Sequence, residues 1–263
     1  NKNLMRTFIP TPANSAFGIG SLTIHYYALC IILGIFVALT LGKKRSGENS
    51  EILIDIAVYA IPAGVIGGRA YHVITTPEKY FNSNFFQAFK IWEGGMGIWG
   101  AIFCGAAVSF WRLKQLGETN LFYPLADSLA PGIIFAQAIG RIGNWFNGEL
   151  FGKPSKLPWA LQIPVEKRPT GFENFATFTP TFLYEALWCV FVGALLLKIK
   201  NYGDGKVFWS YVALYSIGRL VIETFRIDYS HLVFGLRLNV WVALLFFGLA
   251  SIKYVKIMRG DIR

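Results

Sequence analysis

Seven long apolar stretches constrain this chain more than any other feature of its sequence. They cover residues 24–42, 52–70, 94–111, 122–142, 181–198, 207–225 and 238–257. Each is close to the roughly 17–25 residues that an α-helix needs to cross the hydrocarbon core of a bilayer. We therefore predict an all-α polytopic membrane protein with about seven transmembrane helices, forming a single integral membrane domain over residues 1–263.

The composition supports a membrane protein and limits its partners. Hydrophobic residues make up 54% of the 263 residues and charged residues only 15%, whereas about a quarter of a typical soluble domain is charged. The net charge of +10 comes mostly from short segments between the apolar stretches. No basic tract carries interleaved aromatic residues, so we expect anionic lipid and the bilayer, rather than nucleic acid, as partners.

The basic residues also predict how the chain crosses the membrane. They gather after the first, third and fifth stretches and in the tail: Lys43, Lys44, Arg45, Arg112, Lys114, Lys198, Lys200, Lys206, Lys253, Lys256, Arg259 and Arg263. Because cytoplasmic segments carry an excess of Lys and Arg, the N-terminus is predicted outside and the C-terminus in the cytoplasm. No signal-peptide pattern precedes the first stretch, which we expect to be a retained anchor.

The longest connection, residues 143–180, is unlike a solvated linker. It contains five prolines together with Trp159, Phe172, Phe175 and Phe178. It also holds most of the basic residues on the predicted outer side. A segment so rich in aromatic residues is not expected to stay solvated. We predict a small extracytoplasmic cap on the membrane surface, inserted between spans four and five.

The run GRIGNWFNGELFG, residues 140–152, ends the fourth stretch with a concentration of polar groups. At membrane depth Arg141 costs about 2.5–3.5 kcal/mol on insertion scales, so it needs an anionic partner or a wet cavity. The glycines permit close backbone approach, and Asn144 and Asn147 can hydrogen-bond a polar ligand. This pattern predicts a lipid-headgroup pocket. Alternatively, Arg141 extends to the interface and the Asn-Gly pairs form a turn.

Three polar residues recur in the sixth stretch. Tyr215, Arg219 and Glu223 stand at i, i+4 and i+8, which places them on one helical face. Arg219 and Glu223 either neutralise one another, or Arg219 faces a phosphate. In the predicted orientation Glu223 comes near the outer surface, on the side of Arg141, so two arginines from different spans can converge.

Four other residues near the outer ends of the predicted spans allow two interpretations each. Arg69 ends the second stretch and is either a third phosphate ligand or an interfacial anchor. Tyr27 and Tyr184 are either interfacial belt residues or parts of a site. Glu185 either contributes to a site or pairs with an arginine.

Several chemistries lack their sequence patterns. There is no H-E-x-x-H and no His/Cys/Asp cluster at ligand spacing, so we expect no metal centre. There is no G-x-S-x-G run, no Walker loop and no run of paired aspartates. Cys30, Cys104 and Cys189 lie singly in apolar stretches and predict no disulfide framework. The chemistry that the sequence still allows is the binding of an anion by cationic and amide side chains.

The run at residues 140–152 resembles the signature of the prolipoprotein diacylglyceryl transferases of bacteria. Further motifs resemble that family in order and spacing: Gly-Gly-Arg at 67–69, WEGGMGIWG at 92–100, PTFLYEAL at 180–187 and Y-x-x-x-R-x-x-x-E at 215–223. The resemblance therefore extends over nearly the whole chain.

The resemblance implies a transferase of the bacterial cytoplasmic (inner) membrane, with seven spans, an outer cap and its active site toward the outer face. Its reaction would move the diacylglyceryl group of phosphatidylglycerol to the lipobox cysteine thiol of a prolipoprotein signal peptide. A thioether would form and glycerol 1-phosphate would leave, as the first step of lipoprotein maturation. Neither a cofactor nor a metal is implied.

The resemblance also implies roles for individual residues. Arg141 corresponds to the family's phosphatidylglycerol-binding arginine and Arg219 to its second essential arginine. Catalytic roles are predicted for Arg141, Arg219, Glu223, Tyr27, Asn144 and Glu149. Phosphatidylglycerol binding is predicted for Arg141, Arg219, Asn144, Gly152, Tyr215 and Arg69.

One departure bears on the mechanism. Where many family members carry a histidine, proposed as a base or a substrate ligand, this chain has Trp99, which cannot take a proton. A cationic site favours ionisation of the substrate thiol without that histidine. Glu223 and Glu149 would then orient the arginines or accept the thiol proton, and both assignments stay open.

Two other functions are consistent with parts of the sequence. One is a transporter or channel for an anionic substrate, against which stands the lack of a visible inverted repeat. The other is a membrane scaffold whose polar residues only join helices. A scaffold would not need two arginines and an Asn-Gly-Glu corner on the same side of the membrane.

Overall fold

The computed structural model describes residues 8–20, 22–81, 85–91, 94–200, 202–228, 230 and 232–260. Trp92 and Glu93 of the motif at 92–100, and Arg263 of the basic tail, lie outside the described residues. The chain divides into two compact units. The larger unit holds residues 1–42 and 126–263, and the smaller unit holds residues 43–125.

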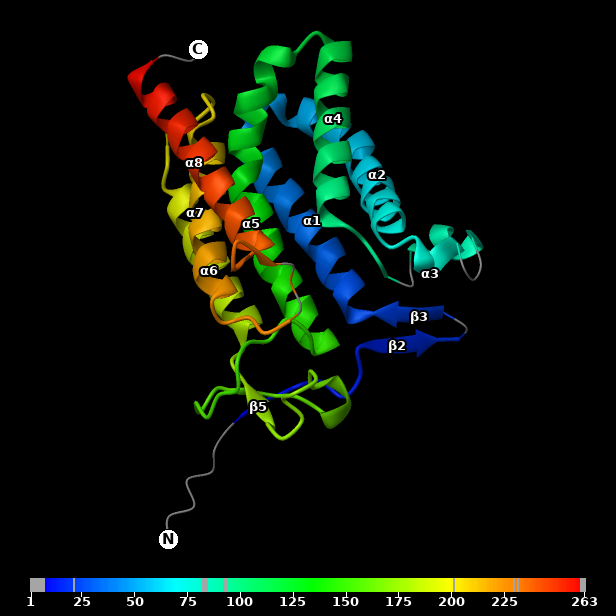
Figure 1. The fold of residues 1–263 in the computed structure, drawn as a ribbon. Helices are drawn as coiled ribbons and strands as arrows, with labels where there is room; N and C mark the ends of the chain where they lie inside the picture. Colours follow the sequence, from blue (N-terminus) through cyan, green and yellow to red (C-terminus); the bar gives the residue numbers. More distant parts are fainter. Residues whose placement is uncertain are drawn as a thin grey trace. The chain divides into compact units, whose positions relative to one another are not determined.

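Helices make up most of both units (Figure 1). The long helices are α1 (Tyr26–Ser46), α2 (Ser50–Thr75), α4 (Ile98–Leu116), α5 (Phe122–Asn147), α6 (Thr181–Leu197), α7 (Lys206–Glu223) and α8 (Leu238–Arg259). Shorter helical pieces are α3 (Glu78–Phe81) and the 3-10 segments Gly47–Asn49, Phe85–Phe89, Thr119–Leu121 and Val165–Lys167. Each predicted apolar stretch overlaps one long helix. The number of membrane crossings and their orientation stay predictions.

Short strands pair where the chain leaves the helices. They are β1 (Ile9–Pro10), β2 (Ala16–Ile19), β3 (Leu22–His25), β4 (Leu161–Gln162), β5 (Thr177–Phe178), β6 (Leu232–Val233) and β7 (Leu236–Arg237). The strand pairs β2–β3 and β6–β7 are antiparallel. The all-α prediction omitted these strands because they are only two to four residues long, too short to show an alternating apolar pattern.

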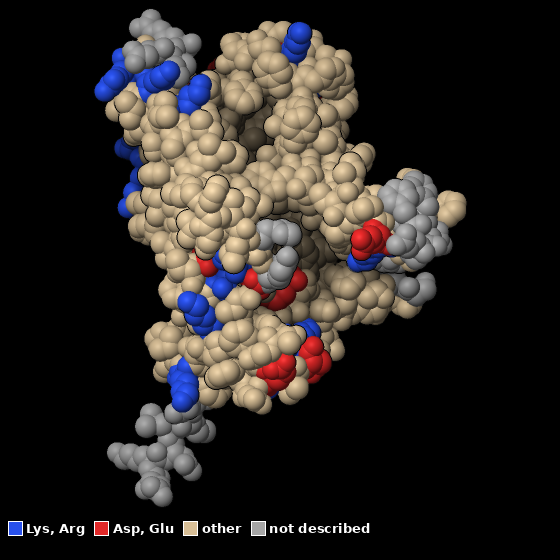
Figure 2. Space-filling view, in the orientation of Figure 1, with Lys and Arg blue, Asp and Glu red and all other residues tan. Residues whose placement is uncertain are grey.

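The long helices expose many apolar side chains. The segments Tyr26–Thr75, which holds α1 and α2, and Leu238–Arg259 are long and apolar enough to cross a bilayer, and Thr181–Leu197 is apolar but shorter. Large apolar side chains point outward from them: Phe36 in α1 is 66% exposed and Leu245 in α8 is 60% exposed. Most of the surface in Figure 2 is uncharged. Exposed apolar surface on this scale calls for a lipid environment.

In the larger unit, small residues bring α1 and α5 close together. A β-carbon at Gly132 would lie 2.7 Å from the carbonyl oxygen of Ala38, and one at Gly34 would lie 3.2 Å from Ala136. Such close approach is typical of small residues in packed membrane helices. On its other side α5 joins α6 and α7 through a core of Ala130, Ile134, Ala138, Cys189, Val192, Leu196 and Val207. This packing fixes α5, which carries Arg141.

The connection after α5 is a packed structure and not a solvated linker. Strand β4 pairs in parallel with β1 and antiparallel with β5. Phe151, Leu161, Ile163, Phe178 and Phe182 form its buried apolar core. Of the aromatic residues named in the sequence, Phe178 lies in this core and Phe172 packs against it, whereas Trp159 and Phe175 are exposed. The sequence argued against a solvated linker but did not predict this core. The position of this cap segment on a membrane surface stays a prediction.

Helix α5 ends later than the sequence indicated. It continues to Asn147 instead of ending near residue 142, because the helical hydrogen bonds satisfy the backbone while the polar side chains find partners of their own. The turn comes at Gly148, with φ +62°, and Leu150, with φ +57°. Glycine adopts a positive φ more easily than any other residue does. Arg141 and Asn144 consequently lie within the helix, one turn apart.

Candidate active site

The predicted polar face of α7 is buried in the larger unit. Arg219 Nη2 lies 2.9 Å from Glu223 Oε2 one turn away. The Tyr215 hydroxyl donates to Glu185 Oε1 of α6 at 3.4 Å. Glu185 and Glu223 are only 4% and 2% exposed. Since buried carboxylates need cationic partners, this face must be closed by the arginines around it.

Arg141 and Arg219, from α5 and α7, meet at the carboxylate of Glu185. Arg141 Nη2 lies 2.6 Å from Glu185 Oε1, and Arg219 Nη1 lies 3.6 Å from Glu185 Oε2. Arg141 also donates to the Tyr215 hydroxyl at 3.4 Å. The expected convergence of two arginines is therefore present, and Arg219 pairs with Glu223 as well. The interpretation that Arg219 and Glu223 neutralise one another is confirmed, and the interpretation that Arg219 faces a phosphate stays a prediction.

One nitrogen of this cluster is unused. Arg219 Nη1 is buried and has no hydrogen-bond partner among the described residues, although it lies 3.6 Å from the Glu185 carboxylate. A buried donor without an acceptor is costly. An anion entering between Arg141 and Arg219 would supply the missing acceptor.

Two residues that sequence reasoning missed complete the surroundings of Glu223. Arg237 Nε lies 2.6 Å from Glu223 Oε1, and Asn239 Nδ2 donates to the same oxygen at 3.2 Å. Both lie where β7 meets α8. The signal available in the sequence was a charged and an amide residue flanking Leu238, where the last apolar stretch begins. Their distance along the chain from Glu223 concealed the contact.

Further charged side chains pair with one another in the loop between α7 and α8. Arg226 donates to Asp228 Oδ1 at 2.7 Å and to Oδ2 at 2.9 Å, and Arg237 Nη2 lies 3.2 Å from Asp228 Oδ2. Burial raises the pKa of the Asp228 carboxyl, but the hydrogen bonds from Arg226 and the charges of Arg226 and Arg237 outweigh it and lower the pKa below its ordinary value. Asp228 is therefore an ionised partner of both arginines.

The Asn-Gly corner at the end of α5 holds a second carboxylate. Asn144 Nδ2 and Asn147 Nδ2 each donate to Glu149 Oε1 at 2.9 Å. Arg141 Nη1 donates to Asn144 Oδ1 at 3.4 Å, so the corner is joined to the arginine cluster. The residues around Gly148 form the turn that the sequence offered as an alternative. The turn is therefore observed, and a lipid-headgroup pocket at the same residues stays a prediction.

Tyr27 and Gly152 lie at the edges of this site. The Tyr27 ring packs against Gly143, where an added β-carbon would lie 2.7 Å from its Cδ2 atom, and its hydroxyl lies within electrostatic range of Arg141 and Glu149. Gly152 pairs with Arg226 in an isolated bridge. A β-carbon at Gly152 would lie 2.7 Å from the carbonyl oxygen of Phe225. Gly152 thus permits close contact between the cap and the end of α7.

Arg69 belongs to the smaller unit, where its guanidinium group holds a loop. It donates to the backbone carbonyls of Ala88, Gln87, Gly94 and Gly95, and lies 5.0 Å from the centre of the Tyr80 ring. Its side chain is therefore engaged with backbone in that unit. Trp99, the second residue of α4, is 40% exposed.

Other candidate features lie elsewhere in the described residues. No group of three or more His, Cys, Asp or Glu side chains that could hold a metal ion was found in the part of the chain that the structure describes.

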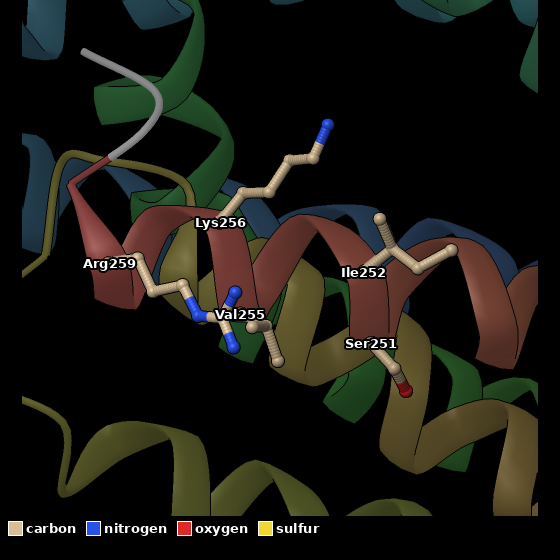
Figure 3. A pocket seen from close by; sticks show the side chains of 5 residues that line it. All are labelled: Ser251, Ile252, Val255, Lys256 and Arg259. Carbon is tan, nitrogen blue, oxygen red and sulfur yellow. The ribbon is translucent and has the colours of Figure 1, made fainter.

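A pocket on the last turns of α8 is lined by Ser251, Ile252, Val255, Lys256 and Arg259 (Figure 3). All five residues come from one helix, and none belongs to the predicted site. This pocket is an open helix face with two cations at its end.

Comparisons with known proteins agree with the motifs. The family model described as prolipoprotein diacylglyceryl transferase matches residues 14–256. Phosphatidylglycerol–prolipoprotein diacylglyceryl transferase 2 of Streptomyces coelicolor is 45% identical over 91% of this chain and 78% of the relative. The transferase of Streptomyces griseus is 47% identical over 94% and 77%, and that of Corynebacterium diphtheriae is 44% identical over 96% and 95%. This chain belongs to the prolipoprotein diacylglyceryl transferase family.

Proposed function

We propose that this chain transfers the diacylglyceryl group of phosphatidylglycerol to the thiol of the lipobox cysteine in a prolipoprotein signal peptide. The names of its relatives support this lipid and this class of protein substrate. The observation that carries the proposal is the meeting of Arg141 and Arg219, from two helices, around one buried carboxylate, with Arg219 Nη1 lacking a hydrogen-bond partner in the described residues.

The two arginines bind the phosphate of the lipid. Forked guanidinium donors match phosphate oxygens and act more strongly in a dry site than in water. The phosphate takes the place of Glu185 on part of each guanidinium group, using the free Nη1 donor of Arg219. Tyr215, which contacts both Arg141 and Glu185, fixes the rotamers of this pair.

The reaction is a substitution at the glycerol carbon that bears the phosphate. The sulfur of the cysteine thiolate forms a C–S bond to the phosphate-bearing carbon of the diacylglycerol half, not to that of the headgroup glycerol, and the bond between that carbon and the phosphate oxygen breaks. Glycerol 1-phosphate leaves with the electron pair. Negative charge grows on its oxygens, where Arg141 and Arg219 stabilise it. The substrate supplies the nucleophile, so the protein needs no covalent intermediate.

Glu149 accepts the thiol proton, and Glu223 orients Arg219. Glu223 is fully buried and its two oxygens face two guanidinium groups, so it is committed to ion pairs. Glu149 is exposed, and its carboxylate is held by the amide groups of Asn144 and Asn147 alone among the described residues. A general base must be accessible to the substrate and must not be held in ion pairs. In this proposal the thiol proton passes to Glu149, and no histidine is needed at position 99.

The remaining predicted residues shape the site around these groups. Tyr27 closes one side of it against Gly143, and Asn144 links Arg141 to Glu149. Gly152 lets the cap approach the end of α7. Arg69, in the smaller unit, holds a loop through its backbone carbonyls, and its predicted role in lipid binding is proposed separately from this site. Neither a metal nor a cofactor takes part.

The protein functions as one multi-pass domain in the bacterial cytoplasmic membrane. Its seven long helices span the bilayer, with the N-terminus, the cap and the active site on the outer side and the C-terminus in the cytoplasm. The exposed apolar faces of α1 and α8 support this placement. The cations in the last turns of α1 and α8 support the orientation.

A reconstituted reaction tests the function. Purified protein in detergent, with phosphatidylglycerol and a synthetic lipobox peptide, is expected to add the mass of diacylglyceryl to the cysteine and to release glycerol 1-phosphate. A Cys→Ser peptide is the control and should stay unmodified. A chelator is expected to leave the rate unchanged. Anion flux in proteoliposomes without any thioether would overturn the proposal in favour of a transporter.

A further inference from the structure

Arg237 turns inward from a segment whose other side chains are apolar and exposed. Phe234, at the tip of the β6–β7 hairpin, is 93% exposed, and Leu236 and Leu238 are 44% and 45% exposed. The Arg237 side chain is only 17% exposed. Its Nε contacts Glu223, its Nη2 contacts Asp228 Oδ2 and its Nη1 donates to the carbonyl of Asp228 at 2.9 Å. All of its nitrogens therefore have acceptors inside the protein.

The Glu223 carboxylate is divided between two cations. Its Oε2 lies 2.9 Å from Arg219 Nη2, and its Oε1 lies 2.6 Å from Arg237 Nε. The Glu223 side chain has no exposed area, so water cannot stabilise its charge. Arg237 gives it a compensating cation that does not depend on Arg219. Arg219 can then turn toward another anion without leaving a buried charge unpaired.

The same arrangement exists on the other side of Arg219. There Glu185 is shared with Arg141, which approaches it to 2.6 Å. Arg219 is thus bracketed by two carboxylates, each of which has a second arginine. In this row of five residues, three guanidinium groups face two carboxylates, which leaves one excess positive charge. Including Arg226 and Asp228, which also contacts Arg237, adds one charge of each sign and leaves the excess at one. A phosphodiester carries one negative charge.

We infer that Arg237 is a positioning residue for the lipid substrate. It holds Glu223 so that Arg219 is available to a phosphodiester, and it supplies the excess charge that this anion neutralises. Without Arg237 the row would be neutral, and Glu223 would retain Arg219. The inference rests on the proposed function and extends it to a residue that does not itself touch the substrate.

Steady-state kinetics with Arg237→Gln and Arg237→Lys test this role. In Arg237→Gln the KM for phosphatidylglycerol is expected to rise at least tenfold, with a smaller change in kcat. Arg237→Lys keeps the charge and is expected to recover part of the loss. Arg259→Gln is the matched control, since Arg259 is exposed in the last turn of α8, at the end opposite Arg237, and its KM should equal that of the wild type.

A second substitution separates this role from a merely structural one. Arg237→Gln combined with Glu223→Gln removes both charges and restores the excess positive charge of the row. The double variant is therefore expected to bind phosphatidylglycerol more tightly than Arg237→Gln alone. Thermal unfolding is followed for each variant. If Arg237→Gln is unstable, the double variant is compared with the wild type, whose excess positive charge it shares, and binding weaker than in the wild type by tenfold or more would contradict the inference.

Two results would overturn the inference. One is a KM in Arg237→Gln within twofold of the wild-type value, and the other is no recovery of binding in the double variant. Binding of phosphatidylglycerol is measured directly as well, with phosphatidylcholine of the same acyl chains for comparison. The role of Arg237 is thereby decided even if the wild type forms no thioether, a result that would overturn the proposed function instead.

Discussion

At the scale of single residues, four charged side chains in the interior form a continuous series of ion pairs. The guanidinium groups of Arg141 and Arg219 and the carboxylates of Glu185 and Glu223 alternate at distances of 2.6 to 3.6 Å. Isolated charges at such depth would be strongly unfavourable. In the alternating order each charge has a neighbour of the opposite sign, which reduces this cost.

Replacing Arg141 with lysine tests whether the site needs the forked guanidinium group of an arginine. Arg141→Lys keeps the charge but cannot contact Glu185, Tyr215 and Asn144 from one planar group. We expect kcat/KM for diacylglyceryl transfer to fall at least about 100-fold, the usual effect of losing one transition-state donor. The measurement is peptide lipidation followed by mass spectrometry.

The control for that substitution is Arg168→Lys. Arg168 also uses its fork, donating to the carbonyls of Ile163 and Glu173, but it lies in the cap and has no role in the reaction. Its activity should remain close to that of the wild type. Full activity of Arg141→Lys would contradict the assignment of Arg141 to the phosphate.

Glu149→Gln tests the proton acceptor. Glutamine can still accept from Asn144 and Asn147 through its amide oxygen, but it cannot take a proton. We expect kcat to fall at least about 100-fold, within the range usual for a lost general base, while the KM for phosphatidylglycerol changes little. Glu166→Gln, at an exposed position in the cap, is the control. Normal kcat in Glu149→Gln would exclude Glu149 as the base.

At the scale of elements, the site depends on how helix ends meet. Helix α7 presents Tyr215, Arg219 and Glu223 along one face because they lie one turn apart. The start of α8 brings Arg237 and Asn239 to the same carboxylate. The cap segment after α5 then contacts the chain just beyond α7 through Gly152 and Lys153, whose backbone nitrogen donates to Phe225 at 2.9 Å.

Gly152→Ala tests this junction. The added methyl group would lie 2.7 Å from the Phe225 carbonyl oxygen and 2.9 Å from Thr181 Cγ2, so the backbone must shift. Overpacking of this kind costs about 1–3 kcal/mol, and the shift would also displace Arg226. We expect a lower unfolding temperature in detergent together with reduced transfer.

Gly248→Ala serves as the comparison for the junction. A β-carbon at Gly248, in α8, would have no atom within 4 Å, and alanine is the better helix former. Its unfolding temperature should be equal to or above that of the wild type. If Gly152→Ala were as stable and active as Gly248→Ala, close approach at Gly152 would not be required.

At the scale of the whole molecule, exposed apolar side chains surround buried charged ones. Phe36 and Leu245 point outward while Glu185, Glu223 and Asp127 are buried. Asp127 illustrates how the interior charges are satisfied, since its carboxylate accepts from the backbone nitrogens of Gly203, Gly205 and Phe208. The burial pattern is that of a protein whose solvent is lipid.

Cysteine labelling tests the predicted orientation in that membrane. In a variant lacking Cys30, Cys104 and Cys189, Glu166→Cys in the cap is expected to react with a membrane-impermeant thiol reagent added to intact cells. Lys114→Cys, near the end of α4, is expected to react only after the membrane is permeabilised. The reverse pattern would contradict an outer cap and a cytoplasmic C-terminus.

Part of this architecture could be predicted from the sequence because it depends on local rules. The long apolar stretches overlap the seven long helices, since helix formation in an apolar segment follows from length and composition. The face of α7 followed from a spacing of four residues. The aromatic content of residues 143–180 argued against a solvated linker, and this segment contains a packed core. Five motifs in order identified the family, which the comparisons confirm.

The rest was decided by tertiary structure because it depends on which distant groups come together. Nothing in the local sequence says that Glu223 is shared by Arg219 and Arg237, that Glu185 joins Arg141 to Arg219, or that Asn144 and Asn147 hold Glu149. A buried charge must find its counterion wherever the fold provides one. Sequence alone therefore determined the family and predicted most of the candidate site residues, but not Arg237 or Asn239. Only the packing of α5, α6, α7 and the start of α8 decided how these residues are paired, because the partners lie far apart in the chain.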